Sequence, residues 1–358
     1  MSDRSINLLK RLTEADAPSG FEDEARRIFE DELREIGEIK KDRMGNLFCS
    51  HTGSSDTPVV MLDCHPDEVG FMVQSITSQG FIKFVPLGGW WGHVLLSQRM
   101  TVMGDKGKIH GVISATPPHL LEKGAREKVV HIEAMHIDVG AADREEAMDK
   151  FGIQPGNPIA PFSPFIPMAN PKMLSAKAFD NRCGCGLVIE SMQRLAEQDH
   201  PNQIYGVASV QEEVGIRGAE VSVARVKPDV AIVLEAPPAD DLPGSDRDAL
   251  QGIPGKGIQL RLFDPTMIVR PQLARFVQDI AEEKKIRHQV SVRRAGGTNA
   301  RAIHRYGQGV ATIVLGVPAR YIHTHVSIIH IDDYLAGLDL VEALVMKLDE
   351  QALENIYR

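Results

Sequence analysis

The sequence predicts an α/β fold with a small all-β domain inserted into it. In the first and last parts of the chain, short apolar runs that end in a carboxylate or a histidine alternate with amphipathic helical segments. Between about residues 71 and 165 the pattern changes to short alternating runs separated by glycines, which is typical of a β module. At 358 residues the chain also exceeds one typical core. We therefore expect residues 1–70 and 166–358 to form one domain and residues 71–165 to form an inserted domain.

The first part of the chain predicts two helices followed by two strands. Residues 4–16 form the first helix, and Ser19 followed three residues later by Glu22 is a capping-box pattern for the second. After a first strand, the apolar run at residues 58–63 predicts a buried strand. That strand leads directly into His65 and Asp67.

In the sequence after the inserted domain, each predicted strand again ends near a polar group. The turn at residues 178–182 precedes a helix and contains Asp180. The buried strand at 204–210 leads into Glu212 and Glu213. In open α/β sheets, ligands bind beyond the carboxyl ends of the strands. Two adjacent glutamates there can divide a task, one holding a metal ion and the other moving a proton.

Two later predicted strands each add one candidate metal-binding side chain. The strand at 229–235 ends in Glu235, and the strand at 309–315 is followed by a turn that contains His323. These groups and those above are imidazoles and carboxylates without a thiolate, which suits zinc, cobalt or manganese. Two metal ions that share a bridging carboxylate need about five or six protein ligands, and the set is large enough to supply them.

Composition narrows the choice of partners and compartment. The formal net charge of −9 argues against nucleic-acid binding. No apolar run is long enough to span a bilayer, so we expect no membrane partner. The four cysteines form no Cys-x-x-Cys pair, which favours a reduced, cytoplasmic setting.

Six runs of sequence, in this order, resemble the motifs of the M42 family of co-catalytic metallopeptidases, the tetrahedral and glutamyl aminopeptidases. The resemblance covers nearly the whole chain. Because several motifs occur in the right order, it is far more specific than any single motif. The runs are Pro18–Glu22, His65–Gly70, Leu87–Trp90, Ala178–Arg182, Gln211–Gly215 and Arg320–His323.

The resemblance implies a mixed-sheet metallopeptidase domain with two divalent metal ions per subunit. Glu212 is then the general base, and Asp67 orients His65. The family's activity is the removal of N-terminal residues from short peptides, and its inserted domain builds a homo-oligomer, a hollow dodecamer. The implied metal ligands, with Asp180 as the bridge, are His65, Asp180, Glu213, Glu235 and His323.

The chain departs from the family pattern at three positions. Glu235 stands where many members have aspartate, Asn299 where aspartate is usual, and His325 where proline is usual. In an extended backbone His325 would project to the same face as His323, because residues two apart do so. The preferred first residue of the peptide stays open; Arg217, Lys256 and Arg320 are basic candidates to meet an acidic side chain.

Two other functions compete with a peptidase. A glycosidase of the endoglucanase kind needs two carboxylates but no metal ion, and it leaves the histidines unexplained. A non-catalytic peptide-binding scaffold needs neither a general base nor a set of metal ligands, so the presence of both argues against it. His131 and His136 lack the spacing of a helical zinc motif and lie in an alternating run, so we expect them to be structural.

Overall fold

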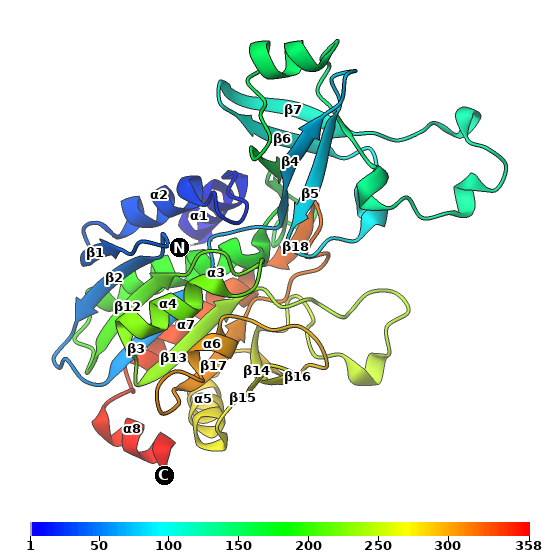
Figure 1. Ribbon diagram of the computed structural model, residues 1–358. Coiled ribbons are helices and arrows are strands. Elements are labelled where there is room, and N and C mark those ends of the chain that lie inside the picture. The colour runs from blue at the N-terminus through cyan, green and yellow to red at the C-terminus, as the bar shows by residue number, and fades with distance from the viewer. Residues whose placement is uncertain (1) are drawn as a thin grey trace.

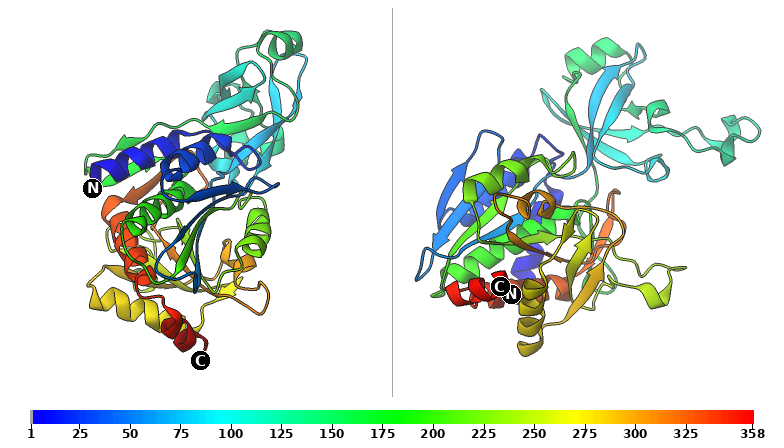
Figure 2. Two further views of the ribbon diagram at one scale, coloured as in Figure 1. Left: turned by 90° about the vertical axis from the view of Figure 1, so that its left-hand side faces the viewer. Right: turned by 60° about the horizontal axis from the view of Figure 1, so that its bottom comes forward.

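The structure, a computed structural model, describes residues 2–358 and divides them between a larger α/β body and a small barrel that stands away from it (Figures 1 and 2). Among these residues no helix is long and apolar enough to cross a membrane.

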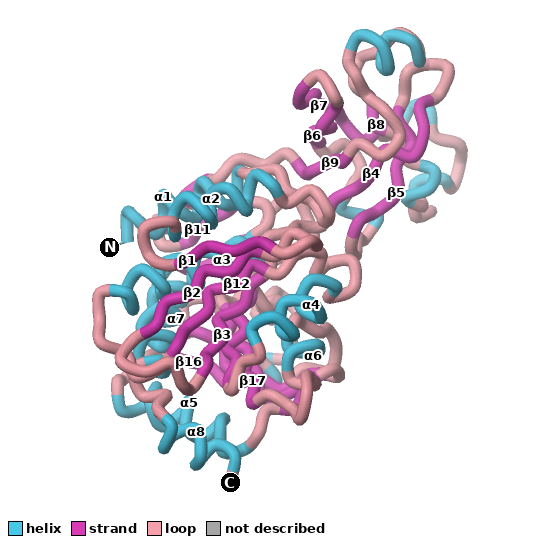
Figure 3. The backbone as a smooth tube through the Cα atoms, turned by 60° about the vertical axis from the view of Figure 1, so that its left-hand side comes forward, coloured by secondary structure: helices cyan, strands magenta, loops and turns pink. Residues whose placement is uncertain are grey.

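A nine-stranded mixed sheet forms the centre of the body (Figure 3), as predicted. Its central strands β12, β3, β13 and β17 run parallel, and antiparallel strands flank them on both sides. Three of these four are nearly continuous apolar runs because both faces of the sheet are covered. Side by side, with β16 (His288–Val292) beside β14, the strands are β1 (Glu38–Lys41), β2 (Leu47–Thr52), β12 (Gln203–Ala208), β3 (Val59–Cys64), β13 (Val230–Glu235), β17 (Ala311–Gly316), β14 (Ile258–Asp264) and β15 (Met267–Ile268).

Helices cover both faces of this sheet, as the left panel of Figure 2 shows. On one face α3 packs on β3 and β13 and lies between α1 and α7, while α4 and α6 lie on the other face. The helices are α1 (Ser2–Glu14), α2 (Asp23–Leu33), α3 (Phe179–Ala196), α4 (Arg217–Val226), α5 (Pro271–Glu283), α6 (Ala300–Ile303), α7 (Ile331–Val345) and α8 (Glu350–Tyr357).

The barrel has its own apolar core, which includes Phe71, Ile82 and Met100. It grows from the carboxyl end of β3, so its first turns lie next to the edge of the main sheet where the parallel strands end. A small sheet, β10 (Ile166–Pro167), β11 (Met173–Ala176) and β18 (Ser327–His330), lies beside that junction. The barrel strands, in order around it, are β4 (Gly70–Ile76), β5 (Ile82–Leu87), β8 (Ile137–Asp138), β7 (Gly107–Ile113), β6 (Arg99–Gly104) and β9 (Pro158–Pro161).

In residues 2–358, five short helical turns lie in the loops between the barrel strands, and a sixth lies in a loop of the body. The segment between β7 and β8 reaches far from the barrel (Figure 1). The turns are η1 (Gly92–Val94), η2 (Pro118–Leu120), η3 (Ala125–Glu127), η4 (Ile132–Ala134), the π-helical η5 (Glu146–Lys150) and η6 (Arg247–Ala249).

Two local expectations are wrong. The Ser19–Glu22 pair does not cap α2: the Ser19 hydroxyl donates to Asp67, and Glu22 accepts from the Gly20 and Gln211 amides. Long-range partners displace the local capping bonds here because Asp67 offers a buried charged acceptor. The alternating run at residues 131–136 contains a short 3₁₀ turn, η4 (Ile132–Ala134), and forms no strand.

Candidate metal centre

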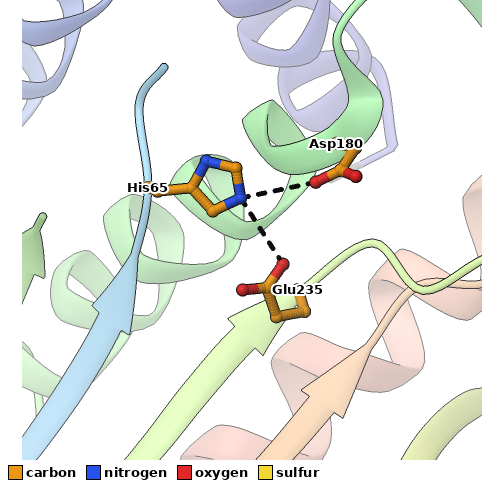
Figure 4. A group of neighbouring side chains, drawn as sticks. All are labelled: His65, Asp180 and Glu235. Atoms are coloured by element: carbon orange, nitrogen blue, oxygen red, sulfur yellow. Dashed lines mark ion pairs between the residues drawn. The ribbon is translucent and has the colours of Figure 1, made fainter. Parts of the chain in front are cut away.

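The parallel strands bring the predicted residues to one edge of the sheet because their carboxyl ends lie together. His65 directly follows β3, Glu235 is the last residue of β13, and Asp180 lies at the start of α3 (Figure 4). The His65 Nε2 atom is 3.4 Å from Asp180 Oδ1 and 3.7 Å from Glu235 Oε2. These three side chains form one group of donors with the spacing of a metal site.

A second group shares Asp180 with the first. The other oxygen of this carboxylate, Oδ2, is 3.4 Å from His323 Nε2, and His323 Nε2 is 3.3 Å from Glu213 Oε2. Asp180 therefore presents one oxygen to each histidine. His65, Glu212 and Glu213 form a third, overlapping group.

Hydrogen bonds at Nδ1 orient both histidines. His65 Nδ1 is 3.2 Å from the Asp67 carbonyl and 3.3 Å from its Oδ1, and His323 Nδ1 is 2.9 Å from the Gly89 carbonyl. All these partners are acceptors, so Nδ1 carries the proton in each ring. Nε2 of each ring is thereby the nitrogen that faces the carboxylates, the orientation that metal-binding histidines require.

Asp67 also holds the loop that carries the adjacent glutamates. Its Oδ1 accepts from the Glu212 amide at 3.0 Å, and its Oδ2 accepts from the Glu213 amide at 3.1 Å and from the Ser19 hydroxyl at 2.6 Å. The strand β12 ends at Ala208, and Gln211 has a φ of 57°, so the backbone has left strand geometry before Glu212. Both glutamate side chains can therefore reach one site, although neighbours in a strand point to opposite faces.

The electrostatics of the centre favour a bound cation. Burial opposes the charged form of His65 and His323, but the neighbouring carboxylates outweigh it and raise the pKa of both histidines, that of His323 to about 10. Burial raises the pKa of Glu213 and Glu235 well above the ordinary value and that of Glu212 to about 7. One oxygen each of Glu213 and Glu235 is buried and has no hydrogen-bond partner among residues 2–358. Buried, unpaired carboxylate oxygens beside imidazole nitrogens fit divalent metal ions.

Several other candidates lie outside these groups. His325 is buried, with Nε2 3.0 Å from the Met100 sulfur, and burial lowers its pKa to about 4. The Asn299 side-chain amide donates to Asp63 at 2.8 Å, and Asp63 lies in β3 two residues before His65. His131 and His136 belong to no candidate metal group among the residues described.

A cavity of about 330 Å³ lies beside the centre, and its lining includes residues of the centre and residues 295–298. The sequence did not single out two arginines that line it, Arg261 and Arg293, whereas Arg217, Lys256 and Arg320 are not part of its lining. Arg320 is instead paired with Asp241. The strand β14 carried a signal for the first arginine: Gln259 and Arg261 alternate with apolar residues and so face one side of the sheet.

Comparison with known proteins identifies the family. A model of M42 glutamyl aminopeptidases matches residues 45–340. The chain is 38% identical to the glutamyl aminopeptidase of Lactococcus lactis subsp. cremoris, over 97% of this chain and 98% of the relative. It is 32% identical to the lysyl aminopeptidase of Pyrococcus furiosus, over 95% of this chain and 96% of the relative.

Solved structures agree with this match. The TET aminopeptidase of the marine sediment archaeon Thaumarchaeota archaeon SCGC AB-539-E09 matches with a TM-score of 0.96 and 40% identity, over 99% of both chains. The TET1 peptidase of Pyrococcus horikoshii, which assembles into a tetrahedron or a large octahedral shell, matches with a TM-score of 0.85 and 30% identity, over 96% of this chain and 100% of that one. A dodecameric form, PhTET1-12s, has the same TM-score and identity, over 96% of this chain and 99% of that one.

Fold and relatives together define a peptide hydrolase of the aminopeptidase class. The chain belongs to the M42 family.

Proposed function

We propose that the protein is a dinuclear-metal aminopeptidase that removes N-terminal residues from short peptides. The observation that carries this proposal is the position of Asp180, whose two oxygens each lie 3.4 Å from a different histidine Nε2. A carboxylate placed in this way is suited to bridge two metal ions. His65 and Glu235 would complete the shell of one ion, and Glu213 and His323 that of the other.

The donor set fits zinc, cobalt or manganese because it combines imidazole nitrogen with carboxylate oxygen and contains no thiolate. When bound, a pair of such ions supplies Lewis-acid polarisation of the scissile carbonyl and lowers the pKa of a bound water. Glu235 retains the carboxylate of the usual aspartate, so its extra methylene changes reach and not ligand type.

Glu212 is the proposed general base. Its Oε2 lies 3.8 Å from His65 Nε2, at the rim of the donor groups, and its backbone amide is held by Asp67. From this position Oε2 would accept a proton from the attacking water while the remaining hydroxide adds to the peptide carbonyl carbon. The same carboxyl would return the proton to the leaving amine as the carbon–nitrogen bond breaks.

Removal of metal ions tests the proposal against its competitors. We expect aminoacyl-anilide hydrolysis to vanish after dialysis against a chelator and to return with zinc, cobalt or manganese, with about two metal ions bound per chain. β-Glucan should not be cleaved in either state. Full anilide hydrolysis by metal-free protein would refute the dinuclear mechanism, and chelator-resistant glucan cleavage would favour a glycosidase.

We also propose that the barrel builds a homo-oligomer, a dodecamer, in the cytoplasm. The barrel stands apart from the body and exposes large apolar side chains, including Trp91, Leu120 and Val129. Similar TET peptidases form dodecamers and larger shells. The four cysteines are free and buried, which suits a reducing compartment. Light scattering at micromolar concentration should give a particle of about twelve chains, and a monomer would contradict the proposal.

A further inference from the structure

The motif Pro18–Glu22 lies outside the metal centre, but its last residue contacts the loop at residues 210–218, which carries the proposed general base. The Glu22 Oε1 atom accepts from the Gly20 amide at 2.6 Å and from the Gln211 amide at 3.2 Å. The Glu22 side chain is buried, and its backbone carbonyl accepts from the Arg26 amide, so α2 fixes the position of this residue. The mechanism described above gives this buried carboxylate no role.

Side-chain oxygens accept from four successive amides at the start of this loop. Asn46 Oδ1 accepts from the Val210 amide at 2.8 Å, and Glu22 accepts from the next amide. The two oxygens of Asp67 accept from the amides of residues 212 and 213 at 3.0 and 3.1 Å. Strand β12 has already ended at Ala208, so these side chains satisfy the N–H groups in place of a neighbouring strand. The loop is thereby attached to three side chains from the first part of the chain.

Gln211 is the residue whose backbone conformation decides where Glu212 points. Its φ of 57° lies in the left-handed region, which is unfavourable for a residue with a Cβ atom. Its amide is held by Glu22, and its carbonyl accepts from the Arg217 amide at 3.2 Å. The amide that follows, that of Glu212, is held by Asp67. Because the peptide groups on both sides of Gln211 are held, both of its dihedral angles are restrained, and the direction of the Glu212 side chain follows from them.

We propose that Glu22 is a positioning residue for the general base Glu212, and that it acts as a hydrogen-bond acceptor for Gln211 and not through its charge. This inference rests on the proposed aminopeptidase function. Both hydrogen bonds of Glu22 use the same oxygen, Oε1, so the carbonyl oxygen of a glutamine in its place can accept both. A general base must lie within hydrogen-bond reach of the water that it deprotonates. Loss of the restraint on Gln211 therefore lowers the fraction of molecules in which Glu212 is placed for proton transfer.

Two substitutions separate the hydrogen bond from the charge. Glu22→Asp keeps the charge but is shorter by one methylene, so its carboxylate no longer reaches the Gln211 amide. Its kcat for an aminoacyl-anilide should fall about tenfold or more, since a misplacement of about 1 Å can cost about 100-fold. KM and bound metal should change little, because Glu213 keeps its own bond to Asp67.

Glu22→Gln keeps the acceptor and removes the charge. Its kcat should stay within about twofold of the wild type, because the position of the base is unchanged. The pH at which kcat is half maximal should also stay where it is. The matched control is Asp23→Ala, whose side chain is 70% exposed and pairs with Arg26; it should leave kcat unchanged.

The opposite pattern, in which Glu22→Asp retains turnover and Glu22→Gln loses it, would show that the charge acts and would overturn the inference. A loss in Glu22→Asp that comes with raised KM and lost metal would mark Glu22 as merely structural and would also refute it. If Glu22→Asp fails to fold, Glu22→Gln still decides, because loss of turnover by a folded, metal-loaded Glu22→Gln protein contradicts the proposal.

Hydrogen exchange gives a readout that does not depend on turnover. In the metal-loaded protein, peptides that cover residues 209–216 should exchange about tenfold or more faster in Glu22→Asp, because an amide without its acceptor loses protection. Glu22→Gln should exchange at the wild-type rate. Unchanged exchange in Glu22→Asp would overturn the inference. A wild-type protein that hydrolyses no anilide defeats the aminopeptidase proposal and the role of Glu212 with it, whereas an active protein with unaltered kcat in Glu22→Asp defeats this inference alone.

Discussion

Replacing Asp67 by asparagine should disrupt the centre although no metal ligand is changed. The carboxylate is fully buried and accepts four hydrogen bonds, two at each oxygen. Oδ1 receives His65 and the Glu212 amide, and Oδ2 receives Ser19 and the Glu213 amide. Each oxygen therefore meets one backbone N–H, and no orientation of an asparagine amide avoids placing its NH₂ group against one of them.

The expected loss of folding stability follows from the number of hydrogen bonds that asparagine cannot make. The less damaging orientation places NH₂ at the Oδ2 position, where the Ser19 hydroxyl can rotate and accept but the Glu213 amide cannot. At least one charge-assisted bond is lost and one buried donor is left unpaired, which corresponds to about 2–5 kcal/mol of folding stability. Displacement of Glu213 should also weaken one metal site, and loss of a group that supports the ligands typically lowers activity or metal affinity about 10- to 100-fold.

Three measurements check this prediction: urea denaturation, bound metal per chain, and kcat/KM for an anilide. Ser19→Ala is the control, because it removes one of the four bonds and keeps the charge and both backbone contacts. It should cost only about 1 kcal/mol and leave the metal content unchanged. An Asp67→Asn protein that is as stable and as fully loaded with metal as Ser19→Ala would refute the reasoning.

Three further predictions concern neighbouring groups. His323→Ala should lose about one metal equivalent whereas His325→Ala should keep both, because His325 contacts the barrel core instead; the reverse stoichiometry would exclude this assignment. Glu212→Gln should retain the metals and lower turnover on the order of 10²–10⁴-fold, whereas Glu213→Gln should lose metal, and similar metal loss in both would contradict the division of roles. Burial, reinforced by the charge of Asp67, raises the pKa of Glu22 from 4.5 to about 7, so the folded protein binds this proton more tightly than the unfolded chain and stability falls as pH rises through that range. Denaturation should therefore show Glu22→Gln more stable than the wild type by about 3 kcal/mol at pH 8 and equal to it below pH 4.5, and a constant difference across pH would disprove this account.

Local patterns in the sequence were sufficient for much of the framework. The apolar runs that became β3, β12, β13 and β17 are recognisable because strands buried on both faces need continuous apolar side chains. Polar groups at their carboxyl ends then predict a site at one edge of the sheet. The ordered motifs also identified the family, and the mixed α/β sheet and the separate barrel both agree with the structure.

Only the tertiary structure decided which groups meet. Chain order does not give strand order: β12 lies between β2 and β3, and β14 runs antiparallel to β17, which brings Arg261 to a cavity shared with residues far away in the sequence. The same holds for the Gly89 carbonyl, which reaches His323 from the barrel across 234 positions of the chain. Local propensity predicts elements because their hydrogen bonds and side-chain spacing are short-range. The orientation of a ligand or the partner of a buried arginine depends on how distant segments pack, and that information is not contained in any local pattern.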